Sequence, residues 1–512
     1  MKKNICLLTV ITFLTLTIVA QPVYEFRAAW IATVDNIDWP TKGNYNTARQ
    51  KEEYIQLLDM HQRNGMNAVI VQIRPATDAF YPSQYEPWSE WLTGKQGKPP
   101  SPYYDPLEFM IAEAHKRGME FHAWCNPYRA IFQEGKSSIA PNHITKKHPE
   151  WFLSYGGKRY FDPGNKQAQE FVVMVIRDIV SRYKADAIHF DDYFYPYRVP
   201  GKEFPDNESF RKYGKGMDKE DWRRSNVDSI IVKLSRAIKE EDPFCQFGIS
   251  PFGVWRNSNK DPEGSNTTAG VTNYDDLYAD IVLWLKEGWI DYVAPQLYWE
   301  FGHRAAPYEI LLDWWSRHSY GRHCYIGLGI YKAGTSTAWR DKTLIPRQIQ
   351  AIRKYPEVQG AIYFSSKSFI NNPLGWSDSL QNNYYKQPAL IPPMPWIDSL
   401  RPSHPEITEA KPLEDAVQIK VVKSGEETKN VKCYRLYACY EEKNNNFNNA
   451  RLIGTKFDTD TCIFLAPLPP DRKVARFFVT CVDENNIESK PYPNYPVQLE
   501  AKKFEKNVWI MN

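Results

Sequence analysis

Residues 65–73 read Gly-Met-Asn-Ala-Val-Ile-Val-Gln-Ile, and this stretch decides the fold class of the 512-residue chain. Its apolar residues are consecutive, which is typical of a parallel strand buried on both faces. The preceding segment, 47–64, has apolar residues at helical spacing, and Gly65 is the kind of residue that ends a helix. A helix that leads directly into a buried strand is the repeating unit of an α/β fold.

This alternation continues to about residue 386. The predicted strands lie at 27–34, 67–73, 119–125, 186–191, 246–252, 290–296, 323–331 and 358–365. The predicted helices lie at 47–64, 106–117, 167–183, 218–241, 275–287, 308–317, 346–354 and 377–385. Eight such units predict a (β/α)8 TIM barrel over residues 21–386. A doubly wound open sheet is the alternative, but the chain lacks the glycine-rich motifs with which such folds bind nucleotides.

A change in composition marks the end of the barrel. Residues 387–405 contain six prolines and predict a stiff linker. Short alternating strands follow within 406–500, and they predict a small all-β sandwich that resembles fibronectin type III or immunoglobulin-like modules. We expect this sandwich to be a spacer or a weak binding module, and residues 501–512 to be a frayed tail. Its strands are expected at 417–422, 432–440, 451–455, 462–465 and 475–482.

The first twenty residues have the pattern of a secretory signal peptide. Lys2 and Lys3 precede an uncharged apolar stretch, 5–19, and Ala20 is a small residue suited to cleavage. We therefore expect export to the periplasm, the cell surface or the medium after cleavage near Ala20. The apolar stretch is shorter than the ~20 residues that span a bilayer, so stable membrane insertion is not expected. The oligomeric state stays open.

Charge and aromatic content indicate the class of partner. The chain has 64 Lys and Arg against 61 Asp and Glu, a net charge of +3, which gives no electrostatic reason to expect nucleic acid. Aromatic residues make up 14%, and all but two of the 17 Trp lie between Trp30 and Trp376. Because aromatic faces stack on sugar rings, we expect a polysaccharide or oligosaccharide substrate bound by the barrel.

Candidate binding residues follow from the barrel geometry. In TIM barrels the site lies at the C-terminal ends of the strands and in the loops that follow them. Polar and aromatic side chains gather at these predicted positions. The candidate substrate-binding residues are Trp30, Arg74, Asp78, His122, Trp124, Asn126, Arg129, His189, Tyr193, Trp255, Gln296, Tyr298 and Trp299.

The predicted fourth strand supplies the candidate catalytic residues Asp191 and Asp192. Alternation puts His189 and Asp191 on one side of this strand, and a carboxylate held there is suited to act as nucleophile or base. Glycoside cleavage needs a second carboxyl group, and spacing does not settle which residue supplies it. Glu300, after the predicted sixth strand, is a further candidate catalytic residue. Two alternatives remain: a carbohydrate-binding barrel without catalysis, and a metal-dependent deacetylase with His122, His189 and Asp191 as ligands. We expect no metal and no cofactor.

Several motifs together resemble one bacterial family, glycosyl-hydrolase-like family 10, over about residues 25–370. They are Arg-Ala-Ala-Trp-Ile-Ala-Thr at 27–33, Gln-Ile-Arg-Pro at 72–75, His-Ala-Trp-Cys-Asn-Pro-Tyr-Arg at 122–129, Ile-His-Phe-Asp-Asp-Tyr-Phe-Tyr-Pro at 188–196, Gly-Ile-Ser-Pro-Phe-Gly-Val-Trp-Arg at 248–256 and Asp-Tyr-Val-Ala-Pro-Gln-Leu-Tyr-Trp at 291–299.

The resemblance implies a secreted barrel glycosidase that acts on a bacterial polysaccharide, including the glycan strands of peptidoglycan. In the broader group of amylase-like and galactosidase-like barrels, the nucleophile is an Asp at the end of the fourth strand, which corresponds to Asp191. An Arg commonly stands two positions before it, where this chain has His189. The fifth strand also lacks the Glu that amylase-like enzymes use as acid, so the resemblance does not assign the acid.

Overall fold

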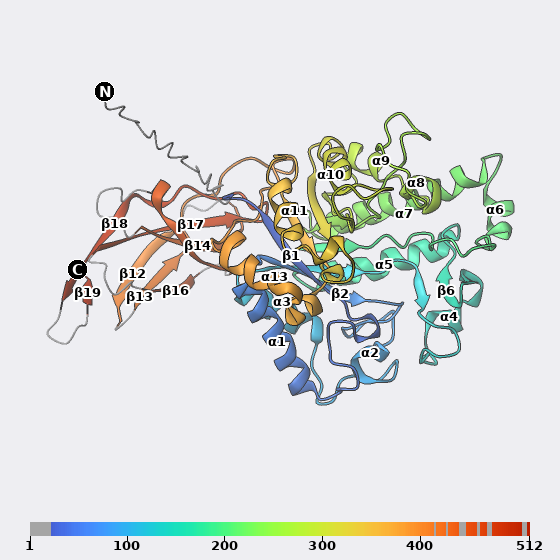
Figure 1. Ribbon diagram of the computed structural model, residues 1–512. Coiled ribbons are helices and arrows are strands. Elements are labelled where there is room, and N and C mark those ends of the chain that lie inside the picture. The colour runs from blue at the N-terminus through green and yellow to red at the C-terminus, as the bar shows by residue number, and fades with distance from the viewer. Residues whose placement is uncertain are drawn as a thin grey trace, which may run out of the picture.

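A computed structural model of the chain describes residues 22–413, 416–425, 429–439, 447–457, 461–467, 474–503 and 509–511 (Figure 1). The predicted signal peptide, residues 1–20, lies outside these described residues. Within the described part of the chain, no helix is both long and apolar enough to cross a membrane.

Eight parallel strands close into a barrel, which confirms the predicted fold. Their order around the barrel is β1-β11-β10-β9-β8-β7-β3-β2. Every residue of these strands is buried, because helices cover the outer face and packed side chains fill the interior. The strands are β1 (Phe26–Ile31), β2 (Ala68–Arg74), β3 (Glu120–Cys125), β7 (Ala187–Phe190), β8 (Gln246–Ile249), β9 (Tyr292–Val293), β10 (His323–Leu328) and β11 (Gly360–Tyr363).

Helices surround this barrel, and one prediction about them is wrong. The single helix expected at 275–287 is divided into α8 (Asn273–Asp276) and α9 (Ile281–Lys286). Tyr278 between them has a φ of 54°, which ends α8, and the Asp280 carboxylate starts α9 by accepting from the N–H of Leu283 at 3.2 Å. The other helices are α1 (Thr47–Arg63), α2 (Glu90–Thr93), α3 (Pro106–Lys116), α4 (Ile144–Lys147), α5 (Lys166–Arg182), α6 (Asn207–Tyr213), α7 (Lys219–Glu241), α10 (Tyr308–Arg317), α11 (Leu344–Ile352), α12 (Ser366–Asn371) and α13 (Trp376–Ser379).

The chain between β3 and α5 carries an insertion that the sequence did not predict. Strands β4 (Arg129–Ile131), β5 (Phe152–Tyr155) and β6 (Lys158–Phe161) form a small antiparallel sheet in the order β4-β6-β5. The insertion begins directly after the C-terminal end of β3. It therefore places Arg129 and Phe132 at the end of the barrel where TIM-barrel sites are found.

The C-terminal part forms two antiparallel sheets that share one core. Their orders are β12-β13-β16 and β15-β14-β17-β18-β19, and buried residues such as Ile419 and Leu436 come from both sheets. The frayed tail expected at 501–512 is wrong in part, since Ala501 pairs with Met511. The likeness to fibronectin type III modules stays a prediction. The strands are β12 (Glu406–Pro412), β13 (Ala416–Val422), β14 (Val431–Cys439), β15 (Arg451–Lys456), β16 (Thr461–Pro467), β17 (Val474–Asp483), β18 (Tyr492–Lys503) and β19 (Trp509–Met511).

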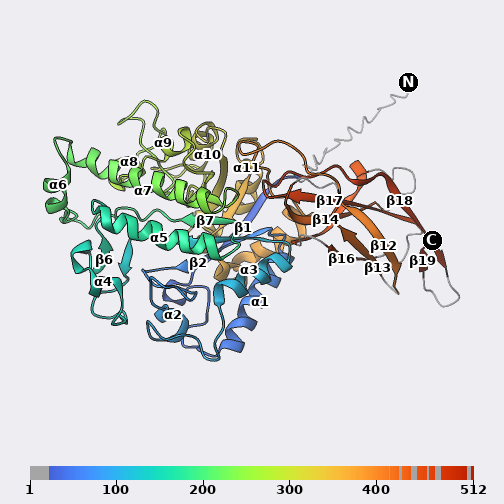
Figure 2. The same cartoon turned by 180° about the vertical axis from the view of Figure 1, so that it is seen from behind.

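The two-sheet domain packs against the N-terminal end of the barrel (Figures 1 and 2). Lys432 on β14 places its Nζ 2.5 Å from Oε1 of Glu120, the first residue of β3, and 2.9 Å from Oδ1 of Asp186, just before β7. Phe457 stacks on His115 with the ring centroids 4.5 Å apart. These buried contacts make the sandwich a packed partner of the barrel rather than a free spacer.

Replacing Lys432 by Met should therefore destabilise the whole protein. The change leaves two buried carboxylates without their shared cation, and breaking such a pair costs about 3–5 kcal/mol. Urea unfolding at pH 7.5 measures the effect. Lys429→Met is a matched control, because Lys429 pairs with Asp398 and Asp483 and leaves the barrel contacts intact. Equal losses in both variants would contradict an anchoring role for Lys432.

Candidate active site

A cavity of about 330 Å³ opens at the C-terminal end of the barrel. The predicted catalytic residues Asp191 and Asp192 line it together with the predicted binding residues Trp30, Trp124, Arg129, Tyr193, Gln296 and Tyr298. The other lining residues are Ala32, Val34, Ile37, Gln72, Phe132, Tyr197, Ser250, Tyr331 and Phe364. Among the described residues, Asp191 and Asp192 are the only carboxyl groups that line this cavity.

Asp191 directly follows β7 and is held by neutral N–H donors. The Trp124 indole donates to its Oδ2 at 3.2 Å, and the Asn126 amide donates to both oxygens at 3.0 and 3.1 Å. Asn126 is fixed in turn, because its own Oδ1 accepts from the N–H of Arg129 at 2.7 Å. Burial raises the pKa of Asp191, although the Arg129 charge and these donors oppose the rise. The donors favour the ionised carboxylate.

Asp192 has the opposite environment. Burial and the charge of the neighbouring Asp191 raise the pKa of Asp192 to about 7, while a hydrogen bond from the Tyr197 hydroxyl lowers it. Two adjacent carboxyl groups removed from water do not both ionise readily. The hydrogen bonds therefore favour the charge on Asp191, whereas burial and the Asp191 charge favour the proton on Asp192.

Aromatic side chains form the walls of the cavity. Trp30 lies 6.0 Å from Phe364, and Tyr298 lies 5.9 Å from Tyr331, measured between ring centroids. The Arg129 guanidinium lies 5.4 Å from the centroid of the Tyr193 ring. Apolar faces beside polar groups are the usual lining of a site for sugar rings.

His189 lies under this cavity as a neutral ring. Its Nε2 accepts from the Trp30 indole at 3.2 Å and lies 3.0 Å from the Ser250 hydroxyl, and its Nδ1 lies 2.8 Å from the hydroxyl of Tyr292. An indole N–H only donates, so Nε2 carries no proton. Burial accordingly lowers the pKa of His189 well below its ordinary value.

Residues 25–343 match the family described as glycosyl hydrolase-like 10. The chain belongs to this family. Glycosyl hydrolase YngK of Bacillus subtilis (strain 168) is 46% identical over 481 residues, which are 92% of this chain and 93% of that protein. Glycosyl hydrolase DigH of Escherichia coli (strain K12) is 39% identical over 379 residues, 69% of this chain and 85% of that protein.

One solved structure is also similar. The glycoside hydrolase domain of PgaB (BpsB) from Bordetella bronchiseptica is 14% identical, with a TM-score of 0.41 over 71% of this chain and 99% of that domain. The resemblance seen in the sequence is thus confirmed by the family match. Membership of glycosyl hydrolase-like 10 and the names of these relatives support a glycosidase-type function.

Glu300 of this family member does not line the cavity. Its Oε2 accepts from the Trp339 indole at 3.2 Å, away from Asp191 and Asp192. The expectation that Glu300 could be the second catalytic carboxyl is therefore corrected. A position just after a strand end was a poor guide here, because Glu300 bonds to Trp339 and does not line the cavity.

Arg74 and Asp78 lie below the surface of the cavity. Arg74 is fully buried, and its guanidinium forms an ion pair with Glu86 in the loop after β2 at 2.5 Å. The Asp78 carboxylate accepts from the N–H of Ala76 at 3.2 Å. Both were expected to bind substrate, and neither lines the cavity. Arg74 also donates to the Pro127 carbonyl at 3.3 Å, so it joins the loops after β2 and β3.

Three further candidates lie elsewhere in the barrel. His122 is enclosed in the interior with Glu120 and Tyr292. The Trp255 indole donates to Asp280 at 3.3 Å, outside the lining. Trp299 meets Phe252 edge to face at 5.4 Å and also lies outside the lining. Asn126 and His189 do not line the cavity either, but they hold Asp191 and Trp30, which do.

The sequence did not indicate Tyr197, Phe132 and Phe364 as site residues. Tyr197 follows Asp192 by five positions in an irregular loop, where no periodicity predicts which side chain turns inward. Phe132 lies in the unpredicted insertion. Phe364 follows β11 and is apolar, so a search for polar strand ends passes over it.

Replacing Trp124 by Phe keeps an aromatic ring but removes one donor from Asp191. Because that hydrogen bond stabilises the carboxylate, its loss should raise the pKa of Asp191 by about one unit. The acid limb of the pH–rate profile for glycan hydrolysis should move up by the same amount. Trp255→Phe removes an indole outside the cavity and serves as the control. An unmoved acid limb in Trp124→Phe would contradict this role.

Proposed function

We propose that this protein is an exported glycoside hydrolase that cleaves a bacterial polysaccharide, with the glycan strands of peptidoglycan as the substrate. One observation carries the proposal: an aromatic cavity holds two neighbouring carboxyl groups, of which hydrogen bonding favours ionisation in Asp191 and burial favours protonation in Asp192. The resemblance to the family supplies the substrate, and the predicted signal peptide supplies the compartment.

In the proposed reaction, Asp192 is the general acid. Its proton passes to the glycosidic oxygen while the bond from that oxygen to the anomeric carbon breaks. The Asp191 carboxylate either forms a bond to the anomeric carbon or takes a proton from the water that does. The aromatic walls hold the sugar rings, and Arg129 and Gln296 are placed to meet hydroxyl groups.

Hydrolysis of purified glycan strands tests the proposal directly. Release of reducing ends is measured for a panel that includes peptide-free peptidoglycan glycan and common polysaccharides. Asp191→Asn and Asp192→Asn should each lower the rate by about 10³-fold or more while the fold is retained. Asp313→Asn, on α10 and outside the cavity lining, is the matched control.

The other outcomes identify the alternatives. Binding without release of reducing ends from any member of the panel would favour a carbohydrate-binding barrel. Loss of activity with a chelator would favour a metal-dependent deacetylase, although His122 and His189 both use ring nitrogens on Tyr292. A loss in Glu300→Gln as large as in Asp192→Asn would reinstate Glu300 as the acid.

The proposed acid also predicts a pH dependence. Asp192 must be protonated to act, and its pKa is raised to about 7, so the rate should fall as the pH rises through about 7. The Tyr197 hydroxyl donates to Asp192 and lowers this pKa. Tyr197→Phe should therefore move the alkaline limb to higher pH, by about one unit. Tyr274→Phe, outside the cavity, is the control, and an unmoved limb would contradict Asp192 as the acid.

A further inference from the structure

A line of hydrogen bonds runs through the barrel interior from the cavity to the opposite end. We call Trp30, His189, Tyr292, His122 and Glu120 the relay. The Trp30 indole donates to His189 Nε2 at 3.2 Å, and His189 Nδ1 lies 2.8 Å from the Tyr292 hydroxyl. That hydroxyl lies 2.9 Å from His122 Nδ1, and His122 Nε2 lies 3.1 Å from Glu120 Oε2. All five side chains are buried.

The Trp30 end sets one direction for the hydrogen bonds of the relay, with each histidine ring carrying one proton. The indole only donates, so His189 carries its proton on Nδ1 and donates to Tyr292. The Tyr292 hydroxyl then donates to His122 Nδ1. His122 consequently carries its proton on Nε2 and donates to Glu120. The relay in this direction requires an acceptor at its far end, which an ionised Glu120 provides.

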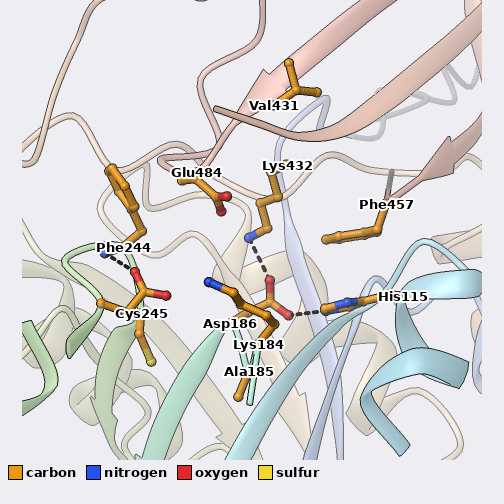
Figure 3. Close-up of a pocket in the computed structure, with 11 residues that line it drawn as sticks. His115, Lys184, Ala185, Asp186, Phe244, Cys245, Val431, Lys432, Phe457 and Glu484 are labelled. Carbon is orange, nitrogen blue, oxygen red and sulfur yellow. Dashed lines mark hydrogen bonds and ion pairs between the residues drawn. The ribbon is translucent and has the colours of Figure 1, made fainter. Parts of the chain in front are cut away.

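Lys432 of the C-terminal domain holds that far end, beside a cavity of about 390 Å³ between the domain and the barrel (Figure 3). Its Nζ lies 2.5 Å from Glu120 Oε1 and 2.9 Å from Asp186 Oδ1. The Asn486 amide donates to the same Glu120 oxygen at 3.1 Å. On its other oxygen, Asp186 meets His115 Nε2 at 2.7 Å. Figure 3 shows the Lys432 side chain pointing toward Asp186, with a dashed line between them.

We propose that Lys432 is a positioning residue of the active site at the opposite end of the barrel: by keeping Glu120 ionised, it sets the direction of the relay and thereby holds the Trp30 indole in the cavity wall. The proposal rests on the proposed function, since Trp30 lines the proposed substrate cavity. It assigns the sandwich a part in the enzyme's activity that a spacer or binding module would not have.

Loss of the Lys432 charge allows the relay to reverse. A protonated Glu120 donates to His122 Nε2, His122 then donates from Nδ1 to Tyr292, and Tyr292 donates to His189 Nδ1. The remaining proton of His189 now lies on Nε2 and faces the indole N–H of Trp30. The Ser250 hydroxyl, whose oxygen lies 3.0 Å from Nε2, can accept that proton, but Trp30 cannot, since two donors do not bond each other. Trp30 then loses its acceptor on His189.

The electrostatics of Glu120 support this switch. Burial favours the protonated form, but the Lys432 charge and the hydrogen bond from His122 outweigh burial and lower the pKa of Glu120 to about 2. Removing Lys432 takes away the largest of the influences that lower the pKa of Glu120, so burial and the Asp186 charge raise that pKa. The titratable groups that face Glu120 are His122, Asp186, Tyr292, His323, Tyr325, Lys432 and Cys433.

The first test compares pH–rate profiles of the full-length wild type with Lys432→Met, Lys432→Arg and the double variant Glu120→Gln/Lys432→Met. In Lys432→Met the ratio of the rate at pH 5.5 to the rate at pH 7.5 should fall about tenfold below the wild-type ratio, which is the effect of one buried hydrogen bond. Lys432→Arg should keep most of the wild-type ratio. The double variant has no carboxyl group to titrate and should lose the extra pH dependence. Lys429→Met is the control.

The second test measures the proton positions themselves and needs no activity. Selective ¹⁵N-histidine NMR should show His189 protonated on Nδ1 in the wild type. In Glu120→Gln, Lys432 draws the amide oxygen toward itself and turns the amide N–H groups toward His122. His189 should then be protonated on Nε2 at every pH, so this variant tests the relay even where Lys432→Met does not fold.

These measurements separate the possible failures. A rate loss in Lys432→Met that is equal at all pH values, or a wild-type tautomer of His189 in Glu120→Gln, would overturn the positioning role. Long-range electrostatics alone would shift the pKa values of Asp191 and Asp192 in opposite directions in the two variants. Lys432→Met removes a positive charge, whereas Glu120→Gln removes a negative one. The expected tautomer shift without hydrolysis of any glycan would contradict the proposed function and leave the relay intact.

Discussion

Buried carboxyl groups at both ends of β7 impose the constraint on which the structure depends. Moving a carboxylate out of water costs several kcal/mol unless it is paired and hydrogen-bonded. At the N-terminal end, Asp186 meets this cost with Lys432 and His115. At the C-terminal end, neutral donors bond to Asp191, and burial with the Asp191 charge raises the pKa of Asp192 to about 7. The N-terminal end, where a cation pairs with the carboxylate, stabilises the fold. The C-terminal end, where the carboxyl groups have raised pKa values, is suited to acid–base chemistry.

Much of the barrel could be predicted because its elements are specified locally. Strands such as β2 are mostly apolar runs, and the helices show apolar residues at helical spacing, so both were found within a few residues. The break between α8 and α9 was missed because it depends on the backbone of Tyr278 and on the cap from Asp280, which leave the apolar pattern unchanged. Asp191 and Asp192 were found because strand ends in a TIM barrel are fixed by topology.

The rest of the site depends on contacts between distant segments, and a single sequence does not show them. Glu300 and Arg74 both lie at strand ends, yet neither lines the cavity. Glu300 bonds to Trp339, and Arg74 pairs with Glu86. Tyr197 acts from an irregular loop whose path has no periodic signal. Lys432 and Glu120 are separated by 312 positions and lie in different domains, so neither pattern nor spacing indicates that they meet.

The interior of this barrel is polar where TIM barrels usually stack apolar layers, and every polar group there needs a partner. The relay is one such line, and a second runs from the Tyr325 hydroxyl to His323 Nδ1 at 2.7 Å and from His323 Nε2 to the Pro393 carbonyl at 3.0 Å. A carbonyl only accepts, so the linker orients this second line as Lys432 orients the first. The second line ends on the linker, and Lys432 of the sandwich binds Glu120 at the end of the first. The barrel sequence therefore specifies the strands, whereas the linker and the sandwich complete the polar core that those strands enclose.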